Sequence, residues 1–403
     1  MKKGLVPALR FPEYRDANEW NTKQLNKIAN IIMGSSPKSS AYNENGVGLP
    51  LLQGNADIKS RLSAPRIFTS QITKECEIGD ILLSVRAPVG TVAKSIHNAC
   101  IGRGMSAIQA IHDNYQEFIY QWLLYFEPFW SDISQGGTFD AVNSDDIRKL
   151  LVPITEKEEQ KKIADCLSSL DDLIAAHTQK HQALQSYKKG LLQNLFPAEG
   201  EMVPALRFPE FENADNWVKE PLENVARYEN GKAHEQGITK SGDFVVVNSK
   251  FISTDGEVKK YTDKAFCLAK KGDILMVLSD VPNGRAIAKC FFVDENNRYT
   301  VNQRICKLSP KKAVGIMLFY SLNRNPYFLA FDDGVKQTNL RKDDVLNCRL
   351  LLPKDIEEQQ KIADCLCSVD DLIRSQAQKI EDLKSHKKGL MQQLFPSVDE
   401  VGA

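Results

Sequence analysis

An internal repeat constrains the fold of this chain more than any other feature of its sequence. The eight residues "VPALRFPE" occupy positions 6–13 and occur again at 203–210. The match extends beyond these letters, because Trp20 downstream of the first copy has a counterpart in Trp217 at the same offset of 197 residues. Long-range self-similarity decides the architecture of a chain, so it must be identified before any local pattern is interpreted. We therefore interpret the sequence as two copies of one folding unit.

A second pair of similar segments closes each copy. The segment "EEQKKIADCLSSLDDLI" at 158–174 is echoed by "EEQQKIADCLCSVDDLI" at 357–373, at an offset of 199 residues. Both continue into a similar ending, which is "KKGLLQNLFP" at 188–197 and "KKGLMQQLFP" at 387–396. Each half of the chain is therefore expected to end in the same long helix.

These two segments carry the aliphatic spacing of coiled-coil helices. Aliphatic side chains recur in alternating steps of four and three residues, an average of 3.5 that is typical of a coiled-coil seam. The alternative, that each segment is an amphipathic helix on a globular core, stays open. The predicted seam residues are Ile163, Leu167, Leu170, Ile174, Leu184 and Leu191 in the first helix, and Ile362, Leu366, Val369, Ile373, Ile380, Leu383 and Leu390 in the second.

Two histidines, His177 and His181, interrupt the first seam one helical turn apart. Such a pair can bind a metal, but no third ligand lies nearby in the sequence. We favour polar contacts that set the helix register. If the two long helices pack on each other with one globular domain at each end, they must be antiparallel. The chain ends would then be the equivalents of the intact linker at 195–211.

Bulk composition bounds the function only weakly. The chain has 403 residues and 42% hydrophobic content, enough for more than one core. Lys plus Arg and Asp plus Glu number 52 each, so any DNA-binding face would have to be local. The nine cysteines show no zinc spacing, which indicates free thiols in a reducing cytoplasm. With no signal-peptide pattern and no apolar run of membrane-spanning length, we predict a cytoplasmic protein without a membrane partner.

The segments between the repeated parts, 20–155 and 217–355, agree only in outline. Both contain strand-like apolar runs, and "GDILLS" at 79–84 has a counterpart in "GDILMV" at 272–277. Helix candidates follow at 115–129 and 313–325, and a glycine loop and an Asp pair precede each Leu-Pro ending. One framework that carries dissimilar inserts indicates two different recognition surfaces.

In this order, the paired "EEQ.KIADCL.S.DDLI" helices, the "KGL...LFP" helix ends, the "GDIL" strands and the two variable halves resemble the specificity subunit of type I restriction-modification systems. The resemblance covers essentially the whole chain. It implies a non-catalytic subunit that reads a bipartite site on double-stranded DNA, one half-site per target recognition domain. It also implies two methyltransferase subunits docked on the helices and restriction subunits in the full complex. S-adenosylmethionine, ATP and Mg would be bound by those partners, and no cofactor by this chain.

The expected fold class is α/β (mixed α+β), with two globular target recognition domains in tandem, two long antiparallel coiled-coil helices between them and a pseudo-twofold internal repeat. The expected boundaries are 1–155 for the first recognition domain, 156–197 for the central helix, 198–355 for the second recognition domain, 356–396 for the C-terminal helix and 397–403 for a tail.

Enzymatic motifs are absent or incomplete. "RNPYF" at 324–328 lacks the second proline of the motif with which adenine methyltransferases hold a flipped base, and we interpret its Asn-Pro as the end of a helix. No phosphate-binding glycine loop occurs. The Asp pairs at 145–146 and 343–344 could be metal ligands, but a helix start is favoured. A stand-alone DNA methyltransferase or nuclease, or a coiled-coil scaffold that binds only proteins, remain the alternatives.

Candidate DNA contacts are chosen by side-chain chemistry, because Arg and Lys reach guanine or phosphate, and Asn and Gln pair with adenine. They lie at loop positions in both variable segments. The candidates are Ser35, Ser36, Gln53, Asn55, Arg86 and Arg103 in the first half, and Lys232, Asn248, Lys250, Asn283, Arg285, Gln303, Arg304, Lys336, Gln337 and Asn339 in the second.

Overall fold

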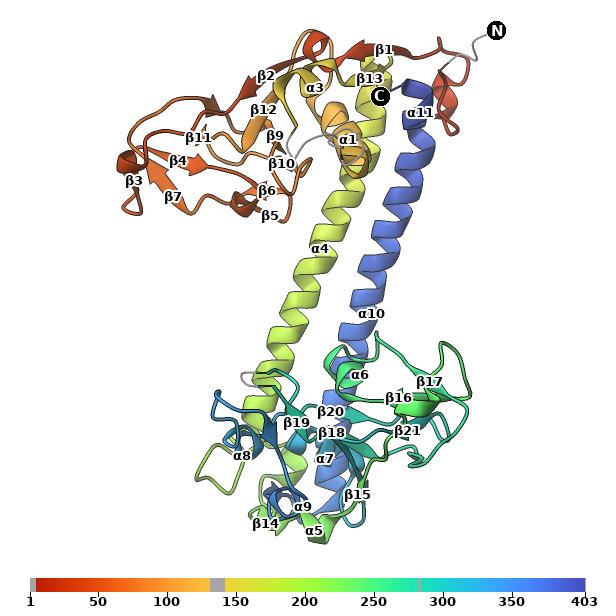
Figure 1. Ribbon diagram of the computed structural model, residues 1–403. Helices are drawn as coiled ribbons and strands as arrows, with labels where there is room; N and C mark the ends of the chain where they lie inside the picture. Colours follow the sequence, from red (N-terminus) through yellow and green to blue (C-terminus); the bar gives the residue numbers. More distant parts are fainter. Residues whose placement is uncertain (1–4, 131–141, 282–283, 403) are drawn as a thin grey trace. The chain divides into compact units, whose positions relative to one another are not determined.

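A computed structural model describes residues 5–130, 142–281 and 284–402. The chain forms two compact units (Figure 1). Unit 1 combines Met1–Lys180 with Gln376–Ala403, and unit 2 is His181–Ser375. Each unit thus contains one variable segment and parts of both long helices, α4 (Lys157–Leu195) and α10 (Ile356–Leu394). Within the described ranges no helix is both long and apolar enough to cross a membrane.

The two larger sheets of unit 1 are mixed, and their central strands are mostly apolar. The strand that follows "GD" at residues 79–80 is buried along its whole length, which explains its continuous Ile-Leu-Leu run. In order, the larger sheet contains β2 (Ala29–Met33), β12 (Met105–Ala110), β9 (Ile81–Ser84), β10 (Val92–Lys94), β6 (Leu62–Ser63) and β5 (Ile58–Lys59); the smaller contains β3 (Tyr42–Asn43), β7 (Ile67–Thr69), β4 (Leu49–Leu52), β11 (Ala99–Ile101) and β8 (Glu75–Cys76).

The core of unit 1 joins residues from both ends of the chain. Helix α1 (Gln116–Phe126) places Phe118 and Trp122 against Phe395, whose ring centroid lies 5.4 Å from each of theirs. The short helix α11 (Val398–Val401) adds Val398 and Val401 to the same core. Strand β1 (Asn21–Gln24) pairs with β13 (Leu151–Ile154) beside it. Unit 1 therefore needs the end of the chain to complete its interior.

Unit 2 repeats this plan with fewer strands. Its larger sheet again centres on the strand after a Gly-Asp pair, here buried Ile-Leu-Met-Val. In order, the sheets are β15 (Ala226–Asn230), β22 (Ile305–Pro310), β18 (Ile274–Val277) and β20 (Cys290–Phe292); β17 (Tyr261–Thr262), β16 (Phe244–Val247) and β21 (Tyr299–Val301); β14 (Val218–Pro221) and β24 (Arg349–Leu352); and β19 (Ser279–Asp280) and β23 (Thr338–Asn339). The short helices are α5 (Leu222–Val225), α6 (Ser249–Ser253), α7 (Gly315–Leu322), α8 (Pro326–Leu329) and α9 (Lys342–Leu346).

Both Asp pairs start helices. Asp145 and Asp146 lie in the first turn of α3 (Ser144–Lys149), where Asp146 and Asn143 form a reciprocal capping box. Asp343 and Asp344 occupy the first turn of α9. Carboxylates are stabilised there by the free backbone N–H groups and the helix dipole.

The interpretation of "RNPYF" as a helix end is only half right. Helix α7 does end just before it, at Leu322. The Asn325 side chain, however, accepts a hydrogen bond from the Tyr327 N–H and caps a new helix, α8, with Pro326 as its first residue. Proline is well suited to that position because its φ is already helical and no N–H is needed.

The predicted seam residues are all buried or half-buried, but they do not all face a helix. Ile163 and Leu167 belong to the core of unit 1, and Leu191 to the core of unit 2. Within unit 1, Lys387 of α10 donates to Asp171 of α4 at 2.6 Å, and the Gln376 amide donates to the His177 carbonyl at 3.0 Å. The two helices thus run in opposite directions in this unit. Some predicted seam residues therefore belong to the cores of their own units, and the contacts between the helices in unit 1 include polar side chains.

Candidate nucleic-acid interface

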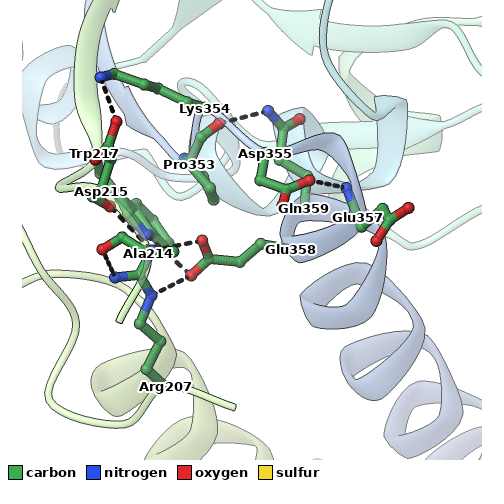
Figure 2. A network of polar contacts seen from close by, with 10 residues as sticks. All are labelled: Arg207, Ala214, Asp215, Trp217, Pro353, Lys354, Asp355, Glu357, Glu358 and Gln359. Carbon is green, nitrogen blue, oxygen red and sulfur yellow. Dashed lines mark hydrogen bonds and ion pairs between the residues drawn. The ribbon is translucent and has the colours of Figure 1, made fainter. Parts of the chain in front are cut away.

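A buried ion pair fixes the repeated "RFPE" segment of unit 2 to its helix. The Arg207 guanidinium donates to both Glu358 carboxylate oxygens, at 2.8 and 2.7 Å, and to the carbonyls of Ala214 and Asp215 (Figure 2). The Trp217 indole N–H also donates to Glu358, at 3.2 Å. Hydrogen bonding to Glu358 raises the pKa of Arg207 above its ordinary value. This network holds the start of the recognition segment against the first turns of α10.

Unit 1 builds the same network from the equivalent residues. Arg10 donates to Glu159 at 2.6 and 2.7 Å and to the carbonyls of Ala17 and Asn18. One difference is the Trp20 indole N–H, which is buried without a hydrogen-bond partner among the described residues. The repeat in the sequence therefore reflects the same Arg–Glu ion pair in both units, and this pair attaches the start of each variable segment to a long helix.

In unit 1, loops that are far apart in the sequence meet at one end of the sheets. Gly34 N–H donates to the Met105 carbonyl and Gly102 N–H to the Leu52 carbonyl, both within 2.9 Å. A Cβ on Gly34 would lie 2.1 Å from the Gly102 carbonyl oxygen, so the approach requires glycine. The Val85 N–H donates to the Gly104 carbonyl at 3.0 Å and adds the loop that carries Arg86.

Five of the six first-half candidates lie on three of these loops. The Ser36 hydroxyl accepts from the Arg103 backbone N–H at 3.1 Å and from its Nε at 3.4 Å, so Ser36 orients Arg103. The Gln53 amide donates to the Tyr42 hydroxyl at 3.0 Å. Ser35 is exposed, and Asn55 is half-buried two residues beyond Gln53.

Arg86, the sixth candidate, is exposed on the loop joined through Val85. The structure thus gathers all six into one polar surface, which we call the unit 1 loop row.

Unit 2 makes the same backbone connections with different side chains. Gly231 N–H donates to the Ile305 carbonyl, and Asn302 N–H donates to the Val247 carbonyl, just as Gly34 and Gly102 do in unit 1. Leu278 N–H donates to the Arg304 carbonyl at 2.8 Å, and Leu340 N–H in turn donates to the Leu278 carbonyl at 2.8 Å. These bonds align the segments 231–232, 247–248, 278–280, 302–304 and 338–340 side by side, and we call this surface the unit 2 loop row.

Five of the ten second-half candidates lie on this row. Lys232, Asn248, Gln303, Arg304 and Asn339 belong to its five segments. Asn248 is partly committed elsewhere, because its side-chain oxygen accepts from the Phe251 N–H and caps α6. Lys250 is exposed on α6, and Arg285 is exposed on the loop that follows β19. Asn283 lies outside the described residues.

The loop 332–337 extends the unit 2 row and is held by its own carboxylates. Asp333 accepts from the backbone N–H groups of Val335 and Lys336 at 2.9 and 3.0 Å, and these bonds lower the pKa of Asp333. The Gln337 amide donates to the Ser279 hydroxyl at 2.7 Å, so this candidate partly serves to brace the loop. Lys336 is exposed at the tip. A loop fixed in advance suits recognition because little ordering entropy is lost on binding.

Several structural residues of these rows escaped the sequence interpretation. Tyr42 receives Gln53, Ser279 receives Gln337, and the Asn302 side chain accepts from the His234 N–H at 3.2 Å. The sequence signal used to choose candidates was a polar residue near a glycine. That signal does not distinguish a residue that holds a loop in place from one that is exposed for binding. Across the described ranges, no group of three or more His, Cys, Asp or Glu side chains is placed to hold a metal.

A family model described as the type I restriction modification DNA specificity domain matches this chain twice, over residues 17–186 and 214–385. Over 180 residues the chain is 35% identical to the putative type I restriction enzyme MjaX specificity subunit of Methanocaldococcus jannaschii, covering 44% of this chain and 42% of that one. Over 293 residues it is 24% identical to the MjaIX specificity subunit of the same organism, covering 64% of this chain and 67% of that one. The alignment with the MjaX subunit thus spans less than half of that protein.

Solved structures show that the fold is shared. The S subunit of the type I restriction-modification system from M. genitalium aligns over 98% of this chain and 100% of its own, with a TM-score of 0.66 and 14% identity. A structure from work on complex assembly and conformational transition of the type I R-M system aligns over 94% and 98%, with a TM-score of 0.55 and 16% identity. The resemblance noted in the sequence is confirmed: this chain belongs to the family of type I restriction-modification specificity subunits and contains two copies of its DNA specificity domain.

Proposed function

We propose that this chain is the DNA sequence-specificity subunit of a type I restriction-modification complex. One observation carries the proposal: two units of the same plan build equivalent loop rows from different polar side chains, with Ser35, Gln53 and Arg103 at the positions of Lys232, Asn248 and Gln303. Two unlike surfaces on one framework suit a bipartite DNA site whose halves differ in sequence. The chain itself is not an enzyme, and methylation and cleavage belong to partner subunits.

The long helices are proposed to be an antiparallel coiled coil that sets the spacing between the half-sites. The support is a pair of equivalent ion pairs, one in each unit. Asp171 accepts from Lys387 at 2.6 Å in unit 1, and Asp370, 199 residues after Asp171, accepts from Lys188 at 2.5 Å in unit 2. Exchanging the helices reproduces the contact, as a pseudo-twofold relation requires. We place the recognition domains at 1–155 and 198–355, the helices at 156–197 and 356–396, and the tail at 397–403.

The N-terminal half of each long helix is proposed to bind a methyltransferase subunit. Asp172 and Leu173 in α4 are identical to Asp371 and Leu372 in α10, and all four are exposed. The two leucines leave 41% and 56% of their surface accessible. Internal packing does not require an exposed leucine to be the same in both copies, whereas two identical partners do. Restriction subunits, and the S-adenosylmethionine, ATP and Mg of the reactions, are then expected on the partner side.

The decisive experiment is methylome sequencing of cells that express this chain with its methyltransferase subunit. We expect one bipartite adenine-methylated motif. Replacing residues 20–155 with the corresponding segment of another specificity subunit should then change one half-site and leave the other intact. Methylation without a bipartite motif would contradict the proposed function. A change in both half-sites would contradict one reader per unit.

A further inference from the structure

One turn in the unit 2 loop row adopts a backbone conformation that is unfavourable for its residue. The Ile305 N–H donates to the Asn302 carbonyl and closes a turn whose central residues are Gln303 and Arg304. Arg304 has a φ of +68°, in the left-handed region where a Cβ is disfavoured. The equivalent position of unit 1 is Gly104, whose φ is not in the left-handed region; a Cβ there would lie 2.2 Å from the Gln53 carbonyl oxygen, so that glycine serves a close approach instead. Glycine would fit the conformation better, so the arginine side chain must offer something else.

Contacts among the described residues do not compensate for this conformation of Arg304. Two other arginines have positive φ, and both use their guanidinium groups internally. Arg61 donates to the Val92 carbonyl at 3.1 Å, and Arg324 donates to the Arg285 carbonyl at 2.8 Å. The Arg304 side chain is exposed and makes no hydrogen bond or ion pair with any residue in the described ranges. Its backbone carbonyl accepts from Leu278, but a glycine carbonyl would do the same. A strained, unpartnered side chain of this kind points to an external ligand.

Arg304 also holds a central place in the unit 2 loop row. Its own segment is bonded on one side to the segment that ends in Asn248, through Asn302, and on the other to the segment of Leu278, which leads on to Asn339. Asparagine side chains suit the adenine edge in the major groove, and arginine suits the guanine edge, where its planar group can donate twice to O6 and N7. Asn339 and the NH2 group of Asn248, whose oxygen caps α6, can also meet base edges, so the position of Arg304 between them favours a base edge over a phosphate contact.

We propose that Arg304 reads a guanine in the half-site bound by unit 2 and is a specificity-determining residue of this chain. The inference rests on the proposed function. The turn fixes the backbone of Arg304 before DNA arrives, and the side chain, which has no partner among the described residues, is left to reach the base edge. Unit 1, which has Gly104 at the same position, must read its half-site with other side chains.

Two substitutions separate this role from alternatives, in the full chain co-expressed with its methyltransferase subunits. Arg304→Gly removes the guanidinium and relieves the backbone. We expect the thermal midpoint of the chain to hold or to rise by up to about 3 °C. Preference for guanine at one position of one half-site should fall about 5- to 150-fold, the equivalent of 1–3 kcal/mol for a bidentate contact. Arg304→Lys keeps the charge but not the fork, and should lose most of the same preference.

A matched control is Asn297→Gly. Asn297 has a φ of +57° and is exposed in the loop between β20 and β21, at the opposite end of β21 from the Arg304 turn. This variant relieves similar strain and should leave the motif unchanged.

Three results would overturn the proposal. The first is a wild-type unit 2 half-site without a G·C pair. The second is an unchanged motif in Arg304→Gly. The third is full guanine preference in Arg304→Lys, which would indicate a phosphate contact. Failure of the proposed function looks different, because the wild-type complex would then give no bipartite motif at all.

Discussion

The buried ion pair of unit 2 allows a quantitative prediction. Arg207 and Glu358 side chains expose only 7% and 1% of their surface, so solvent barely screens their interaction. Replacing Arg207 with Met keeps the aliphatic stem but leaves the Glu358 carboxylate buried without its cation, and it also removes the donors to the carbonyls of Ala214 and Asp215. Breaking one side of a buried pair costs about 3–5 kcal/mol. For a unit of this size we expect the midpoint of unit 2 to fall by about 6–20 °C.

The assay is differential scanning calorimetry, with hydrogen exchange to assign each transition to its unit. Lys354→Met is the control in the same network, because Lys354 and Asp215 form an ion pair at 2.9 Å whose side chains are 56% and 76% exposed (Figure 2). Exposed pairs contribute about 0–1 kcal/mol, so this variant should melt within about 4 °C of the wild type. Equal effects of the two substitutions would refute the argument that burial sets the strength of this pair.

Two other predictions follow from particular side chains, and a third follows from the length of the long helices. Burial lowers the pKa of Lys387 below its ordinary value of 10.5. Between the lowered value and 10.5 the unfolded chain binds more protons than the folded chain, so the stability of unit 1 should rise with pH in this range. Lys387→Met should abolish this rise in urea titrations from about pH 7 to 10.5, and an unchanged slope would contradict the prediction. Burial raises the pKa of Cys306 and Cys348 to about 12. Alkylation of the native protein at pH 8, followed by mass spectrometry, should therefore label the half-buried Cys166, Cys365 and Cys367 first. Early labelling of Cys306 would contradict its burial in the core of unit 2. Deleting residues 174–180 together with 373–379 removes one heptad from each helix and shortens each by roughly 10 Å. The unspecified spacer of the DNA motif should then shorten by about three base pairs. An active complex with an unchanged spacer would contradict the proposal that the helices set the spacing.

The helices and the central strands could be predicted from the sequence because their signals are local and periodic. The predicted helical segments at 156–197 and 356–396 compare with observed helices at Lys157–Leu195 and Ile356–Leu394. The apolar runs after each Gly-Asp pair became the buried strands β9 and β18. In each case neighbouring residues carry enough information to decide the element.

The loop rows could be anticipated only as lists of polar residues. Ser36 and Arg103 bond across 67 positions, and nothing in the sequence near either residue indicates the other. The role of Asn248 as a helix cap was readable in principle, since asparagine often precedes the first turn of a helix. Arg304 was chosen for its charge, but its left-handed backbone becomes visible only in the folded turn. Contacts between distant segments are set by tertiary structure, which single-sequence patterns do not encode.

The core of unit 1 also has a consequence for the order of events during synthesis. Phe395, Val398 and Val401 belong to that core, yet the ribosome makes them after every residue of unit 2. The first recognition segment to be translated is therefore the last to close its interior, and Phe118 and Trp122 must wait for Phe395. Unit 2 has all of its residues by Ser375 and can fold earlier. A stop codon between positions 376 and 395 would thus leave the apolar core of unit 1 incomplete and make the chain a substrate for chaperones.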